Sequence, residues 1–125
     1  MTNQDLFRQI ALGLPGAYED LHRRRPAFRV ERRIFAMLGV TGVGAMFPAL
    51  QNEDVAVVKL DRDDQLNLTA LFDGAVQPTE TYGHHGWTYL QLSQLDEPAL
   101  SLILPLAWRH VAPKRLAAAL AKTSD

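Results

Sequence analysis

The chain has 125 residues, a net charge of −1, 47% apolar and 22% charged residues, and no cysteine. These values are typical of one globular domain with a single core, and we expect residues 1–125 to form it. The lack of cysteine excludes disulfides and thiolate metal sites. The apolar stretches are too short to span a membrane and the N-terminus has no apolar leader, so we expect a cytoplasmic protein with no membrane partner.

The charges are unevenly distributed along the chain. The segment 22–33 holds six arginines and one acid, and the segment 109–122 holds four cations and no acid. The segment 53–73 instead holds six acids and two cations. A basic face can therefore exist on a protein whose net charge is close to zero.

The first element that the pattern predicts is a helix, followed by a pair of strands. The helix begins at Thr2 or Asn3, buries one apolar face and ends at Gly13. A connecting segment then runs through Asp20, and strands are expected at 27–30 and 34–38.

A three-residue turn at 31–33 would set the register of these two strands. Val30 would then lie opposite Ile34, and Phe28 opposite Ala36, all on one apolar face. The other face would carry Arg25, Ala27 and Arg29. Truncating Phe28 or Ile34 to alanine is expected to cost about 2–5 kcal/mol in this register.

The second half of the chain alternates strands and helices. The glycine-rich segment 39–52 either extends the hairpin or forms a flexible loop, and it lacks the Gly-Lys-Ser/Thr ending of a phosphate loop. A strand at 55–60, a helix after Asp61, a strand at 87–92, a helix after Asp96 and a short helix at 114–120 follow. The order α-β(3)-α-β(2)-α indicates a two-layer α+β domain, with an antiparallel sheet and helices on one face.

Four segments resemble one known family. They are HRRRPAFRVERRIFAML (22–38), VVKL (57–60), the YG and GW pairs that flank two histidines (82–87), and VAPK (111–114). They occur in the order seen in the MmcQ/YjbR family, and the resemblance covers nearly the whole chain. It implies a fold similar to type III secretion chaperones and a DNA-binding protein of the double-wing type.

The arginine-rich hairpin is the candidate site. Guanidinium groups bind phosphate through paired hydrogen bonds, and a β-hairpin can lie along a DNA backbone. The expected contacts are Arg23, Arg24, Arg25, Arg29, Arg32, Arg33, Lys114 and Arg115. Two alternatives remain open: the charges protect an edge strand from aggregation, or the chain is a non-enzymatic protein-interaction module, monomeric or homodimeric, with no nucleic-acid role.

The pair His84-His85 between two glycines is the other candidate site. A zinc ion normally takes three or four protein ligands, and adjacent histidines in an extended segment point apart. No serine has a convincing partner for nucleophilic catalysis. We therefore interpret the segment as a loop, and expect no metal, no cofactor and no enzymatic activity.

Overall fold

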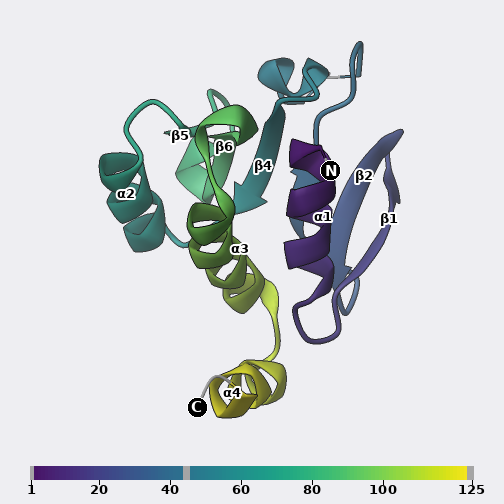
Figure 1. Cartoon of the computed structure of the whole chain (residues 1–125), viewed down its shortest axis with the longest axis vertical. Helices are drawn as coiled ribbons and strands as arrows, with labels where there is room; N and C mark the ends of the chain where they lie inside the picture. The colour runs from purple at the N-terminus through teal and green to yellow at the C-terminus, as the bar shows by residue number, and fades with distance from the viewer. Residues whose placement is uncertain (1, 44–45, 124–125) are drawn as a thin grey trace.

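The computed structural model describes residues 2–43 and 46–123, which form one antiparallel sheet of six strands with helices on one face (Figure 1). The elements in chain order are α1 (Asn3–Leu12), β1 (Tyr18–His22), β2 (Arg25–Val30), β3 (Arg33–Leu38), η1 (Pro48–Gln51), β4 (Val55–Lys59), α2 (Arg62–Leu71), β5 (Val76–Pro78), η2 (Gly83–His85), β6 (Trp87–Gln91), η3 (Leu92–Gln94), α3 (Glu97–Val111) and α4 (Lys114–Thr123). The strand order across the sheet is β1-β2-β3-β4-β6-β5. The predicted α+β class is confirmed.

The sheet has one strand more before α2 than the sequence predicted. The segment YEDLH was expected to be a connection, but it forms β1 and pairs antiparallel with β2. Acidic residues disfavour strands, and here each acid has a cationic partner. Arg8 of α1 pairs with Glu19, and Arg29 of β2 pairs with Asp20. β1 is therefore the edge of the sheet and β2 lies inside it, so the arginines of β2 do not protect an edge strand.

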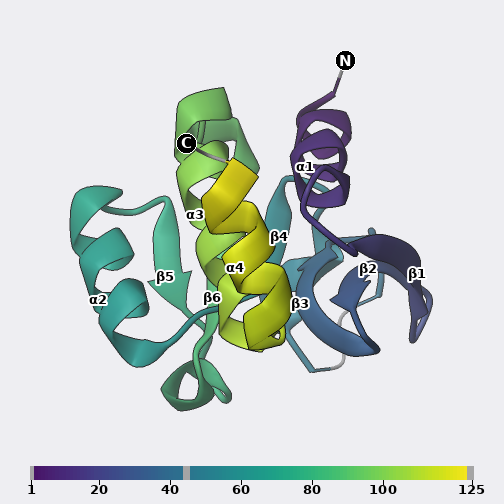
Figure 2. The ribbon, with the colours of Figure 1, turned by 90° about the horizontal axis from the view of Figure 1, so that it is seen from below.

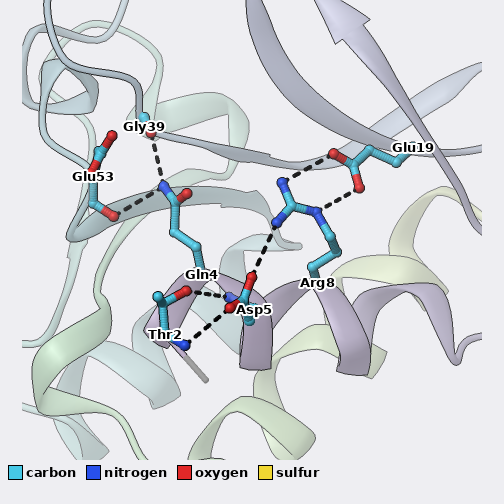
Figure 3. Close-up of polar contacts among 7 residues, drawn as sticks. All are labelled: Thr2, Gln4, Asp5, Arg8, Glu19, Gly39 and Glu53. Atoms are coloured by element: carbon cyan, nitrogen blue, oxygen red, sulfur yellow. Dashed lines mark hydrogen bonds and ion pairs between the residues drawn. The ribbon is translucent and has the colours of Figure 1, made fainter.

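Helix α1 ties together β1 and the segment that joins β3 to β4 (Figure 3). The side chain of Thr2 accepts a hydrogen bond from the Asp5 N–H, which completes a capping box at the helix start. Gln4 Nε2 donates to the carbonyls of Gly39 and Glu53 at 2.9 and 3.1 Å. Together with the Arg8–Glu19 pair, these bonds hold both ends of the β3–β4 connection and the edge strand to one helix.

The main core lies between the sheet and the helices. Phe28 of β2 is fully buried, and its ring meets the ring of Phe7 edge to face at 5.6 Å. Trp108 of α3 is also fully buried, and its Nε1 donates to the Pro15 carbonyl at 2.8 Å. Figure 2 shows α3 and α4 crossing the middle of the molecule, with α2 and β1 at opposite sides.

The hairpin of β2 and β3 has a two-residue turn, so the predicted three-residue turn is wrong. Val30 pairs with Arg33, and Ile34 lies opposite Arg29 on the face away from the helices. The register then shifts between Arg29 and Phe28, which restores the predicted pairing of Phe28 with Ala36. A bulge of this kind compensates for the shorter turn, and the sequence contains no glycine that would have marked either feature.

The face without helices is covered in part by the β3–β4 connection. This segment is neither an added pair of strands nor a bare loop, because Phe47 and Leu50 are buried against the sheet. The Phe47 ring packs at 5.7 Å from those of Tyr82 and Trp87. Gly44 of the glycine-rich segment 39–52 lies outside the described residues. None of the helices that the structure describes is long and apolar enough to cross a membrane.

Candidate nucleic-acid interface

The predicted arginines lie at both ends of β2 and along it. Arg23 and Arg24 form the β1–β2 turn, with φ of 51° and 69°. Glu31 and Arg32 form the β2–β3 turn, with φ of 47° and 73°. Two-residue turns with both φ values positive strongly favour Asn and Gly, because other side chains are strained there by about 1 kcal/mol each. The chain therefore carries arginines at turn positions that glycine would stabilise.

The β1–β2 end is strongly basic. Arg23 and Arg24 are exposed, and neither forms an ion pair with any residue that the structure describes. His22 and Arg25 flank them as the last pair of the hairpin. Burial and the nearby cations Arg29 and Arg23 lower the pKa of His22, so this imidazole resists taking up a further positive charge.

Arg25 and Arg29 are less accessible than the sequence suggested. Arg25 is only 4% exposed, and its Nη2 donates to the Val43 carbonyl at 2.7 Å. Arg29 donates through Nε to both oxygens of Asp20 at 2.9 and 3.0 Å, and through Nη1 to the Arg32 carbonyl at 2.8 Å. Both guanidinium groups therefore already serve the folded structure. Their predicted contacts with phosphate would require these bonds to be rearranged.

The remaining four cations gather at the other end of β2, where α4 begins. Arg33 Nη1 donates to the Val111 carbonyl at 3.3 Å, and Arg115 pairs with Glu31 of the turn. Arg32 and Lys114 are exposed. α4 thus extends the basic surface at the β2–β3 turn and not at the β1–β2 turn. About seven residues of extended chain separate the two groups, or roughly 20 Å.

The two histidines of the second candidate site lie in a short 3-10 helix. Their rings are 3.9 Å apart, so the expectation that they point apart is wrong; it assumed an extended backbone. Gly86 ends this turn with φ of 96°. Within residues 2–43 and 46–123 no cluster of three or more His, Asp or Glu side chains is arranged to hold a metal ion.

Sequence reasoning missed the environment of Arg25. The alternation along β2 placed this residue with Ala27 on the face away from Phe28, and the structure agrees. The alternation could not show that the β3–β4 connection folds back over that face and covers Arg25. The Arg25 Nε is buried and has no hydrogen-bond partner among the described residues.

The architecture is an α+β domain in which an edge hairpin exposes basic turns. The crystal structure of the Deinococcus radiodurans protein DR2400, a DUF419 domain, matches with a TM-score of 0.63 and 16% identity over 86% of this chain and 77% of that one. No curated protein matches the sequence. The family model described as YjbR matches residues 12–110, and the chain belongs to the YjbR family.

Proposed function

We propose that the chain binds double-stranded DNA weakly through its phosphates, and that the β1–β2 turn makes the main contact. The observation that carries the proposal is the pair Arg23-Arg24, exposed and strained at a turn where Asn and Gly would be more stable. Residues held in sparsely populated backbone regions concentrate at functional sites. Guanidinium groups at such a tip are positioned for phosphate oxygens.

The second basic group, at the β2–β3 turn and the start of α4, would make a weaker contact. Its charge is partly neutralised because Glu31 pairs with Arg115, while Arg32, Arg33 and Lys114 remain exposed. Both groups fall within one turn of B-DNA, which spans about 34 Å. The segment 22–38 contains no Asn or Gln to read adenine. Binding is therefore largely independent of sequence, with a dissociation constant of roughly 10⁻⁴–10⁻⁶ M at physiological salt.

The double variant Arg23→Asn, Arg24→Gly separates DNA binding from stability. Asn-Gly suits this turn, so the free energy of unfolding is expected to stay the same or rise by about 1 kcal/mol. Affinity for random duplex DNA is expected to fall, and the slope of log affinity against log salt to become shallower by about two. Fluorescence anisotropy titrations at several salt concentrations measure both quantities.

A control of equal charge is available outside the two basic groups. Arg62 of α2 and Arg109 of α3 are exposed, and replacing both with glutamine also removes two positive charges. This control should leave the salt slope nearly unchanged if the turn is the contact. Equal losses in the two variants would show that only net charge matters. An unchanged slope in the turn variant would contradict the proposal.

A second, non-enzymatic candidate is self-association through the edge strand. Leu21 of β1 is 72% exposed and Tyr18 is 40% exposed, and one edge of this strand has no partner strand among the described residues. Unprotected edges invite pairing with another chain. A stable dimer in light scattering, together with no DNA binding at low salt, would favour this candidate over the first. The YjbR family is not a known enzyme family, and neither candidate involves a reaction.

A further inference from the structure

A pocket of about 160 Å³ opens beside the β1–β2 turn, on the face of the sheet without helices. Arg25 and Met37 line it from the sheet, and Val43, Met46 and Phe47 line it from the β3–β4 connection. An apolar cavity of about 150 Å³ is large enough to hold benzene. The pocket therefore accommodates a small organic molecule with a single ring or a short branched chain.

The polar group in this pocket is a guanidinium without a counter-ion. Arg25 is 96% buried, and it forms no ion pair with an acid among the described residues. Its Nη2 is used by the Val43 carbonyl, but its Nε donor has no partner in that part of the chain. Removing a charge from water without pairing it is costly, and burial lowers the pKa of Arg25. A bound anion would supply the missing charge.

The rim of the pocket also favours an anion. His22, Arg23 and Arg24 line it, and no acidic residue of the described part of the chain does. The Nδ1 of His22 lies 3.4 Å from Nη2 of Arg29. Because a guanidinium only donates, this Nδ1 must accept, and the neutral ring then carries its proton on Nε2. His22 thus adds a neutral N–H donor to the three cations that line the pocket, Arg23, Arg24 and Arg25.

We propose that this pocket binds a small organic anion, with its carboxylate or phosphate group paired to Arg25 and its apolar part packed against Met37 and Phe47. The inference does not rest on DNA binding, because it depends on the buried Arg25 and not on the exposed turn. The two sites share Arg23 and Arg24 at the rim, so a bound anion would also reduce the positive charge offered to DNA.

Thermal unfolding of the full chain with three probes of similar shape tests the proposal. Sodium benzoate and phenyl phosphate supply the anion, and benzyl alcohol is the neutral match, all at constant ionic strength. At ten times its dissociation constant, an anion that binds only the folded state raises Tm by about 5 °C. Benzyl alcohol should produce a much smaller shift. A larger shift with phenyl phosphate than with benzoate would assign the pocket to phosphate esters, and the reverse order to carboxylates.

Two variants of Arg25 test whether this residue is responsible for the rise in Tm with the anions. Arg25→Met removes the unpaired charge while filling a similar volume, so it should fold and lose the benzoate shift. Arg25→Lys keeps the charge without the paired donors and should weaken binding about tenfold. Amide shifts in the NMR spectrum of the unaltered chain give a readout if Arg25→Met does not fold: benzoate should perturb Val43 and Phe47.

Three results would overturn the proposal. One is an equal Tm shift from benzoate and benzyl alcohol. Another is a benzoate shift that persists in Arg25→Met. The third is no effect of either anion up to about 10 mM, the weakest dissociation constant that ordinary ligand efficiency gives for a molecule of this size. Loss of DNA binding in the Asn-Gly turn variant with benzoate binding retained would separate the two sites.

Discussion

Alanine at Gly86 is expected to lower the free energy of unfolding by about 4 kcal/mol or more, or to prevent folding. Gly86 has φ of 96°, and an added Cβ would lie 1.9 Å from the carbonyl oxygen of Leu60. That carbonyl cannot move away freely, because the Leu60 N–H donates to the Gly86 carbonyl at 2.9 Å. Urea denaturation of the variant and the unaltered chain measures the loss.

Gly74→Ala is the matched control for this prediction. Gly74 also has a positive φ, 83°, but an added Cβ there would meet nothing within 4 Å. Only backbone strain remains, which costs about 1–2 kcal/mol. The difference between the two variants therefore measures the close approach of Gly86 to the end of β4. Equal losses would contradict that contact.

The segment around Gly86 illustrates what the sequence can predict. Two glycines around two histidines indicated a loop, and the segment forms a short 3-10 turn in which Gly86, but not Gly83, has a positive φ. The pattern could not identify Leu60 as the neighbour that excludes a side chain, because the contact joins residues that are 26 positions apart and meet only when β4 pairs with β6. The close approach of the two histidine rings likewise follows from a helical turn that the spacing did not reveal.

Local signals located the helices better than the strands. Three helix starts were marked by side-chain caps that act within three residues. Asp61 and Asp96 cap their helices as expected, and Thr2 caps the first helix, for which the sequence left Thr2 and Asn3 open. β1 carries no such signal. Its acidic residues are stabilised by Arg8 and Arg29, which belong to other elements, so the strand becomes favourable only once the sheet has assembled.

For the arginines, too, the sequence predicted the local features but not the tertiary partners. Counting charges located the basic hairpin, and alternation placed Arg25 and Arg29 on one face. Whether a guanidinium is free depends on its tertiary partners: Asp20 for Arg29, the Val43 carbonyl for Arg25 and Glu31 for Arg115. The exposed pair at the β1–β2 turn has no such partner among the described residues, which is why the proposed DNA contact centres on it.

Phe28→Ala is expected to cost about 3–5 kcal/mol, whereas Ile34→Ala should cost about 1–2 kcal/mol. The sequence placed both residues on one buried face with similar costs. The structure separates them. Phe28 is fully buried beneath α1, and its truncation to alanine removes the edge-to-face contact with Phe7. Ile34 lies on the opposite face, opposite Arg29, and is only half-buried.

The comparison of these two variants tests the bulge in the hairpin. Urea denaturation with equal m-values gives the two free energies directly. Equal costs of about 3 kcal/mol or more would place Ile34 in the main core and support the three-residue turn instead. A small cost for Phe28 would remove this residue from the core and contradict the pairing of Phe28 with Ala36. The expected inequality follows from the two-residue turn, which places Ile34 opposite Arg29 and away from the helices, while the register shift keeps Phe28 in the main core.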